Sequence, residues 1–346
     1  MVDTLPIVGV TMGDPAGVGP EIAAKAFADP RCRVACRPLL IGDAEVMAEA
    51  IALTGTDLKI RSIASPAEAR FDASTIDVLQ VGTFDVARLA RGRVNPVCGR
   101  ASYDYVVRAI DLAMAKEIQA TVTNPINKEA VSAAGLRCTG HTEIYAERTG
   151  TTRYTMMLAE GSFRVAHVST HVSLREACDR VKRARVLEVI QLANEACRSL
   201  GIARPRIAVA GLNPHSGENG LFGVEDRDEI QPAVAEAVAA GLAVDGPVPP
   251  DTVFCKLHGG LYDLVVAMYH DQGHIPTKLL GFRYDAATQR WTSVAGVNVT
   301  LGLPIIRTSV DHGTAFDLAG TGQANFDSLL NAVAYAATLA RGRSGV

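Results

Sequence analysis

The chain lacks the features that direct a protein to nucleic acid or to a membrane. Its 34 basic and 37 acidic residues give a net charge of −3, and the longest basic cluster, Lys182-Arg183-Ala184-Arg185, is too short for a polyanion site. No apolar stretch reaches the roughly 18 residues of a membrane span. Residues 1–11 lack the basic start of a signal peptide. We therefore expect a cytoplasmic protein with no nucleic-acid or membrane partner.

Cysteine pairs and nucleotide-loop motifs are also missing. The seven cysteines are scattered, without a C-x-x-C pair, which argues against a disulfide framework or a cysteine zinc site and indicates a reducing compartment. The loop Gly13-Asp14-Pro15-Ala16-Gly17-Val18-Gly19 fits neither the Rossmann nor the P-loop pattern. It is either a nucleotide loop of another kind or a tight turn.

Apolar runs alternate with helical stretches along the chain, which predicts an α/β fold. The helix pattern is clearest from Tyr103 to Met114, where the apolar residues share one face. At 346 residues the chain has about twice the usual single-domain length, which favours two lobes with a cleft. We expect one domain of residues 1–125 with 310–346 and another of residues 126–309. The strand-like runs are Leu5 to Val10, Pro38 to Ile41, Ile76 to Val81, Gln119 to Thr123, Arg164 to Val168, Arg206 to Ala210 and Leu264 to Met268.

Four histidines follow apolar runs: His171, His215, His270 and His312. Ligands of open α/β sheets bind beyond the carboxyl ends of the strands, so these histidines should converge. Three protein ligands with one open position is the pattern of a catalytic zinc site. The spacing matches no local metal motif, and each histidine could instead be a hydrogen-bonded loop residue.

Two further segments concentrate polar groups. Tyr269 to Lys278 contains two histidines, an acid and a lysine in one stretch after a predicted strand, which favours function over an ordinary surface loop. Gly140-His141-Thr142-Glu143 precedes a helical stretch and predicts either an anion site at a helix N-terminus or an ordinary N-cap.

At these residues the sequence resembles the 4-hydroxythreonine-4-phosphate dehydrogenase (PdxA-like) family. The likeness extends from Thr11 to the C-terminal helix and includes Asn124-Pro125-Ile126-Asn127-Lys128, Ser169-Thr170-His171, Gly211 to Glu218, Met268 to Gly273 and Gly296 to Gly320. The resemblance implies that His171, His215 and His270 bind a divalent metal shared across a homodimer interface, with His270 from the opposite subunit. It also implies that Lys278 is catalytic, as those histidines are, and binds substrate together with His141, Thr142, Asn298 and Arg307.

The segment Asp311 to Asn325 is similar to the adenosine-binding loop of isocitrate and isopropylmalate dehydrogenases. This similarity implies a two-lobed fold of that type and an NAD or NADP site without a Rossmann motif. The implied cofactor residues are His312, Gly313, Thr314, Ala315, Asp317 and Asn325.

The implied reaction is a metal-assisted, NAD-dependent oxidation and decarboxylation of a 4-phosphorylated 3-hydroxy acid. The metal would be Zn, Mg, Mn or Co, and no general base is identified. His274 and the long segment Arg283 to Val294 depart from the pyridoxine-biosynthesis pattern and resemble enzymes acting on D-threonate or D-erythronate 4-phosphate. The alternatives are a zinc hydrolase or aldolase without nicotinamide, and a non-catalytic protein that binds a phosphorylated acid.

Overall fold

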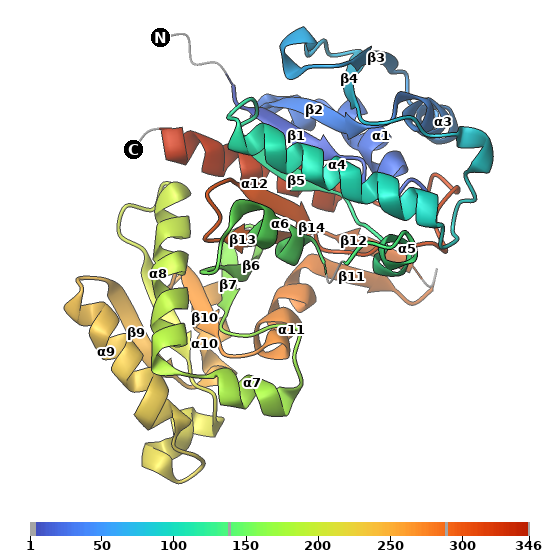
Figure 1. Ribbon diagram of the computed structural model, residues 1–346. Coiled ribbons are helices and arrows are strands. Elements are labelled where there is room, and N and C mark those ends of the chain that lie inside the picture. Colours follow the sequence, from blue (N-terminus) through green and yellow to red (C-terminus); the bar gives the residue numbers. More distant parts are fainter. Residues whose placement is uncertain (1–4, 138–139, 288–289, 345–346) are drawn as a thin grey trace. The chain divides into compact units, whose positions relative to one another are not determined.

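A computed structural model describes residues 5–137, 140–287 and 290–344 (Figure 1). The chain divides into two compact units. The first unit comprises Met1–Thr152, Thr292–Val297 and Leu303–Arg341, and the second comprises Arg153–Trp291, Asn298–Gly302 and Gly342–Val346. The first boundary falls at Thr152 and not near residue 125, because α5 and α6 both pack against α4 of the first unit.

The first unit is built on parallel strands in the order β3-β4-β2-β1-β5-β14. Helix α4 packs across β1, β2 and β5 and buries Tyr105, Val106, Ala109 and Ile110 against them (Figure 1). The elements of the first unit are β1 (Ile7–Thr11), α1 (Gly19–Ala28), α2 (Arg31–Val34), β2 (Arg37–Gly42), α3 (Ala44–Thr54), β3 (Lys59–Ile63), η1 (Pro66–Glu68), β4 (Thr75–Gln80), η2 (Val86–Arg88), α4 (Pro96–Met114), β5 (Ala120–Thr123), α5 (Lys128–Ala133), α6 (His141–Thr149), β14 (Arg307–Val310) and α12 (Asp327–Ser344).

The second unit has the strand order β13-β6-β7-β10-β8-β9, in which β6 is antiparallel to β7, and β7, β10, β8 and β9 run parallel. Strands β11 and β12 form a separate two-stranded sheet. The elements of the second unit are β6 (Thr155–Glu160), β7 (Phe163–His167), α7 (Leu174–Arg180), α8 (Arg183–Ser199), β8 (Arg206–Ala210), η3 (Pro214–Gly220), η4 (Asp226–Ile230), α9 (Gln231–Ala239), β9 (Ala243–Val248), α10 (Pro250–His258), β10 (Leu264–Ala267), α11 (His270–Gly281), β11 (Phe282–Asp285) and β13 (Val297–Leu301). Strand β12 (Arg290–Val294) begins in the second unit and continues in the first from Thr292.

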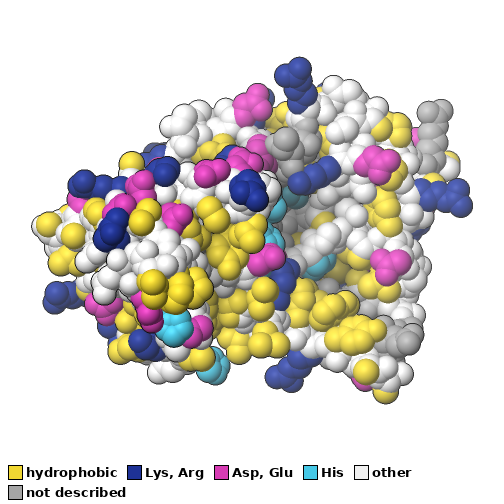
Figure 2. All heavy atoms as spheres, turned by 90° about the horizontal axis from the view of Figure 1, so that it is seen from below, with side chains coloured by type: hydrophobic (Ala, Val, Ile, Leu, Met, Phe, Trp, Pro, Cys, Tyr) yellow, Lys and Arg dark blue, Asp and Glu magenta, His cyan; other side chains and the backbone are white. Residues whose placement is uncertain are grey.

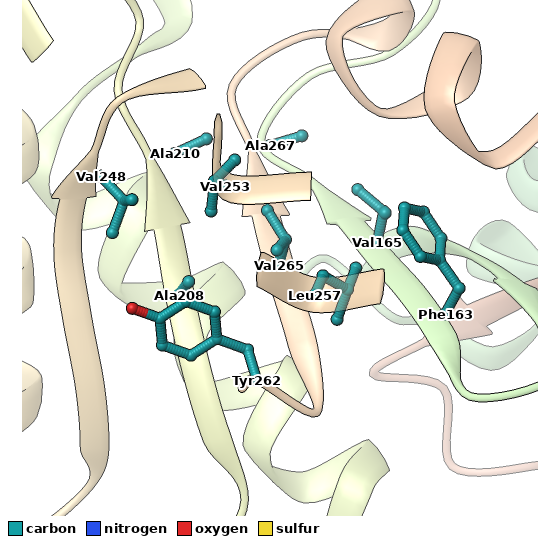
Figure 3. Packing of buried hydrophobic residues seen from close by; sticks show 10 residues of the cluster. All are labelled: Phe163, Val165, Ala208, Ala210, Val248, Val253, Leu257, Tyr262, Val265 and Ala267. Atoms are coloured by element: carbon teal, nitrogen blue, oxygen red, sulfur yellow. The ribbon is translucent and has the colours of Figure 1, made fainter. Parts of the chain in front are cut away.

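Figure 3 shows part of the second unit's core, an apolar cluster between α10 and the central strands. Val253 and Leu257 of α10 pack against Val165 of β7 and Val265 of β10. Burial of such aliphatic side chains stabilises the fold by about 1.5 to 3 kcal/mol each. This packing fixes the strand ends from which the polar site residues extend.

The α/β prediction is confirmed, and each predicted strand run overlaps an observed strand. These runs were recognisable because strands buried on both faces are apolar throughout their length. Among the described residues no helix is long and apolar enough to cross a membrane. On the face shown in Figure 2, basic and acidic side chains are interspersed, in keeping with the small net charge of −3.

Candidate active site

Three of the predicted metal-binding histidines follow neighbouring parallel strands of the second unit. His171 comes after β7, His270 after β10 and His215 after β8, and these strands are adjacent in the order β7-β10-β8. Gln272 ties two of the strand ends together, since its Oε1 accepts a hydrogen bond from Met268 N (2.6 Å) and its Nε2 donates to Gly211 O (2.8 Å). The sheet therefore directs all three segments to one edge.

His171 and His270 lie beside one another at this edge, with ring centroids 5.7 Å apart. Two imidazoles bound to one ion through nitrogens at about 2.1 Å have ring centres roughly 5 to 6 Å apart, so this pair fits a common metal. The Nδ1 atom of His270 lies 2.6 Å from Asp271 Oδ1, which leaves Nε2 for a ligand. Both rings line an open pocket of about 590 Å³ that Glu176 and Asp271 also line.

Two more histidines extend this pair into the protein. The ring of His274 stacks on that of His270 with centroids 3.6 Å apart, and the buried His167 lies 4.8 Å from His274. Burial lowers the pKa of His167 to about 3 and that of His274 to about 4, so both rings are neutral at neutral pH. Gly273 permits this packing, because a Cβ there would lie 2.4 Å from His167 Nε2.

Among the described residues, His215 does not form a metal-binding group with His171 and His270. It begins a run of five residues with left-handed backbone, from φ 53° at His215 to φ 57° at Asn219, which non-glycine residues adopt only at a cost. Asp226 holds the preceding segment by accepting hydrogen bonds from Leu212 N (2.8 Å) and Asn213 N (3.1 Å). Within the described ranges, no three histidine, cysteine, aspartate or glutamate side chains form a metal-binding group.

A candidate anion site lies in the first unit, where α6 begins at His141. Burial lowers the pKa of His141 well below its usual value, and the nearby cations Arg307 and Lys128 lower it further. The Nε2 atom of His141 is buried and has no hydrogen-bond partner in the described part of the chain. Thr142 is the second residue of the same helix. A neutral imidazole, two cations and free N–H groups at a helix start suit a phosphate.

Arg307 is only 3% exposed, in β14 beside β5. Its Nη2 donates to Thr123 Oγ1 (2.8 Å), and its guanidinium lies 5.7 Å from the centre of the Tyr145 ring. Burial lowers the pKa of Arg307 to about 10, so the guanidinium stays charged at neutral pH. The nearby carboxylate of Glu143 opposes this lowering. A planar guanidinium of this kind also suits a substrate phosphate.

The other predicted substrate residues belong to the second unit. Asn298 donates from Nδ2 to Met156 Sδ (2.8 Å), while its buried Oδ1 has no partner among the described residues. Lys278 extends from α11 with its Nζ 4.5 Å from the centre of the Phe282 ring. The predicted substrate set is thus divided between the units, with His141, Thr142 and Arg307 in the first.

The predicted cofactor residues lie in the first unit, between β14 and α12. His312 Nδ1 contacts Gly313 O (2.9 Å), Ala315 has a left-handed φ of 42°, and Asp317 is exposed. Thr314 O accepts a hydrogen bond from Val18 N (3.0 Å), so the glycine-rich N-terminal loop packs against this segment. Asn325 Oδ1 accepts from Asp327 N (2.8 Å) at the start of α12.

Lys128 and His167 were not predicted as site residues, and His274 was singled out only as a departure from the family pattern. Lys128 belongs to Asn124-Pro125-Ile126-Asn127-Lys128, which carried the resemblance, but its proximity to His141 depends on the packing of α5 and α6 on α4. His167 ends β7 and looked like any strand terminus. No local sequence signal distinguishes these residues.

Comparison with known proteins defines the class as a dehydrogenase. The family model "Pyridoxal phosphate biosynthetic protein PdxA" matches residues 34–336. The D-threonate 4-phosphate dehydrogenase of Cupriavidus necator is 46% identical over 99% of this chain and 100% of its own. The 4-hydroxythreonine-4-phosphate dehydrogenase of Desulforapulum autotrophicum is 45% identical over 97% and 96%. The crystal structure of the Klebsiella pneumoniae 4-hydroxythreonine-4-phosphate dehydrogenase superposes with a TM-score of 0.87 at 44% identity, covering 98% of this chain and 99% of that one.

The chain belongs to the PdxA family. This membership confirms the predicted dehydrogenase and implies a nicotinamide cofactor. The hydrolase, aldolase and binding-protein alternatives lose their support, because the matched enzymes are dehydrogenases along their full length.

Proposed function

We propose that the chain oxidises and decarboxylates D-threonate 4-phosphate, with NAD as oxidant and a divalent metal as an aid. The observation that carries this proposal is the buried Arg307 of β14 near the half-buried His141 at the start of α6, which together have the chemistry of a phosphate receptor. D-Erythronate 4-phosphate and 4-hydroxy-L-threonine 4-phosphate are the alternative substrates.

In the proposed reaction the C3 hydroxyl becomes a ketone. Its C3 hydrogen leaves as hydride to the nicotinamide, and the hydroxyl proton is released. The carboxylate then stands β to a carbonyl, so the bond between C1 and C2 can break with loss of CO₂ and protonation of C2. The phosphate does not react, and binding it at a fixed site orients the C3 hydroxyl relative to the cofactor.

His171, His215 and His270 would hold the metal. The 5.7 Å spacing of two of these rings and the engagement of His270 Nδ1 by Asp271 fit a divalent ion. When bound, the metal supplies a Lewis acid that favours hydroxyl ionisation and stabilises negative charge during loss of CO₂. Glu176 and Asp271 on the pocket wall disfavour a phosphate there and favour a cation.

The substrate's phosphate would bind to Arg307, His141, Thr142 and the first N–H groups of α6. Because burial keeps His141 neutral, one of its ring nitrogens can donate a hydrogen bond while Arg307 supplies the charge. The family resemblance adds Lys278 and Asn298 as further substrate residues. The orphaned Oδ1 of Asn298 suits a substrate hydroxyl as donor.

The choice of D-threonate 4-phosphate is supported by His274. The family resemblance implies an apolar residue there in the pyridoxine enzymes, whereas this chain places an imidazole against His270.

We also propose a cytoplasmic homodimer with a shared metal site. Among the described residues, His215 forms no three-ligand group with His171 and His270, so a second copy would supply the missing ligand. Apolar side chains beside the site are exposed: Ile275 and Leu279 lie one turn apart on α11, and Tyr284 and Trp291 form an edge-to-face pair on β11 and β12. An apolar patch next to an incomplete site suits a second copy of the chain.

The test compares the three phosphorylated acids at equal concentration with NAD and Mn²⁺, Mg²⁺, Co²⁺ or Zn²⁺. We expect the highest kcat/KM for D-threonate 4-phosphate, equal amounts of NADH and CO₂, and loss of activity with EDTA that returns with metal. NADP in place of NAD gives the cofactor preference. Faster turnover of 4-hydroxy-L-threonine 4-phosphate would overturn the substrate assignment, and absence of NADH with all three would overturn the reaction.

A further inference from the structure

Two side chains of α1 hold the main chain of a distant loop. The carboxylate of Glu21 accepts hydrogen bonds from Gly320 N (2.5 Å) and Gly322 N (2.7 Å). One turn further along α1, the ammonium group of Lys25 donates to Gly322 O and to Ala324 O, the latter at 3.0 Å. Glu21 is only 2% exposed and Lys25 is half-buried, so these are partly buried bonds to charged groups, which are among the stronger hydrogen bonds.

The two glycines make this arrangement possible. Gly320 and Gly322 have left-handed backbone, with φ 85° and φ 68°, and their N–H groups converge on a single carboxylate. Backbone N–H groups that converge in this way form an anion-binding concavity. Because the carboxylate of Glu21 occupies it, this glycine turn is not available to a phosphate of the dinucleotide.

The held segment follows directly on the cofactor residues of the proposed function. Asp317 lies three residues before Gly320, and Asn325 follows Ala324. The segment contains no helix or strand between β14 and α12, so its position depends on such side-chain bonds. On the other side of the same loop, Val18 N donates to Thr314 O (3.0 Å). Residues 18–25 thus hold both sides of the cofactor segment.

We propose that Glu21 and Lys25 are positioning residues for the nicotinamide cofactor: they fix residues 320–324 so that the segment around Asp317 is preorganised for the adenosine part. This inference rests on the proposed cofactor site. Preorganisation lowers the cost of binding without touching the reacting carbon. Glu21 and Lys25 therefore set the affinity for NAD and leave the chemical step unchanged.

The test uses Glu21→Gln and Lys25→Met in the full chain. In Glu21→Gln the amide offers one oxygen acceptor and turns a donor toward the second N–H. Lys25→Met keeps the side-chain length and removes both bonds to carbonyl oxygens. We expect the NAD dissociation constant, measured by calorimetry without substrate, and the KM for NAD to rise about tenfold or more. The kcat at saturating NAD should stay within about twofold, and Lys25→Arg should restore affinity.

Glu236→Gln is the matched control, because Glu236 forms an exposed ion pair with Arg183 in the second unit. A purely structural role would lower the melting temperature of Glu21→Gln and Lys25→Met but leave the NAD dissociation constant of the folded protein unchanged, and that result would overturn the inference. Lys25→Met is the second variant if Glu21→Gln does not fold.

Asp317→Ala separates this inference from the proposed cofactor site. If Asp317→Ala weakens NAD binding and neither α1 variant does, the positioning role is overturned and the cofactor site stands. If Asp317→Ala also leaves NAD binding unchanged, the cofactor assignment fails together with the inference built on it. Weakened binding in all three variants supports both.

Discussion

His274 stacks face to face on His270, with ring centroids 3.6 Å apart and an interplanar angle of 12°. The two residues are four apart on α11, so their side chains share one face of the helix. His274 Nδ1 also contacts His270 O (2.9 Å). This arrangement restricts the orientation of the proposed metal ligand.

We therefore expect His274→Leu to weaken metal binding by roughly tenfold, the usual scale for a group that supports a ligand. The leucine fills a similar volume but cannot stack as a planar ring. Competition with a chelator measures the metal affinity directly. His258→Leu, an exposed histidine at the end of α10, is the control. If His274→Leu binds metal as tightly as wild type, the stack has no supporting role.

Each of His171→Ala, His215→Ala and His270→Ala should reduce turnover to near background while the fold is retained, because a three-ligand site loses its geometry when one ligand is removed. NADH absorbance measures the rate, elemental analysis the metal content and circular dichroism the fold. Wild-type activity in any one variant, or an unchanged metal content, would remove that histidine from the site. His215→Ala is the most informative of the three, because among the described residues His215 forms no metal-binding group with the other two.

Asp317→Ala should chiefly raise the KM for NAD, since the resemblance places this residue near adenosine and not near the reacting carbon. Its exposed position in the segment before α12 is compatible with a ligand contact. Steady-state kinetics at varied NAD and saturating substrate measure the effect. A loss of kcat with unchanged NAD affinity would instead place Asp317 in the chemical centre.

A pH dependence of stability follows from Asp14, which is fully buried in the N-terminal loop. Burial raises the pKa of Asp14 from 3.8 to about 6, although hydrogen bonds from backbone N–H groups of Ala16 and Asn127 oppose the rise. The folded state therefore binds more protons than the unfolded state between about pH 4 and pH 6, and the contribution of Asp14 to stability falls as pH rises through this window.

Asp14→Asn removes this titration. The free energy of unfolding of the variant minus that of wild type should thus increase from pH 4 to pH 6.5, by an amount on the order of 2 kcal/mol. Urea unfolding at several pH values measures it, and any constant offset from the amide cancels. Asp29→Asn is the control, because Arg31 lowers the pKa of Asp29 below 3.8, so its effect on stability changes below about pH 4 and its difference should stay nearly flat in this window. A flat difference for Asp14→Asn would contradict the buried, raised carboxyl.

The sequence was most informative where structure repeats locally. Apolar runs marked the buried strands, and histidines placed after three such runs lie at one edge because β7, β10 and β8 are neighbours. The pairing of His171 with His270 follows from that topology. The start of α6 at His141 was visible from Gly140 and the polar residues after it.

Contacts between residues distant in sequence were not visible. Glu21 reaches Gly320 across almost the whole chain, and a glutamate in the first turn of a helix is equally expected from the helix dipole alone. The left-handed run from His215 to Asn219 contains only one glycine, so the sequence offered no glycine pattern that predicts such a backbone. Lys128 joined the anion site only through helix packing.

In the proposed homodimer, the three metal ligands come from two subunits. The family resemblance assigns His270 to the opposite subunit from His171 and His215. Within one chain, however, His171 and His270 lie 5.7 Å apart and His215 does not join them, which favours His215 as the partner's ligand. Both assignments separate His215 from His270. A mixture of the inactive variants His215→Ala and His270→Ala should therefore regenerate activity after subunit exchange.

The expected recovery is about one quarter of wild-type activity, because random exchange makes half of the dimers mixed and two-fold symmetry gives each mixed dimer one intact site of two. Two further mixtures then decide the assignment. His171→Ala with His270→Ala recovers only if His270 comes from the partner, whereas His171→Ala with His215→Ala recovers only if His215 does. The exchange itself is verified by mixing chains of different mass tags. If exchange occurs and none of the three mixtures recovers activity, the site is not shared, and all three imidazoles must come together within one chain by movement of the loop that carries His215.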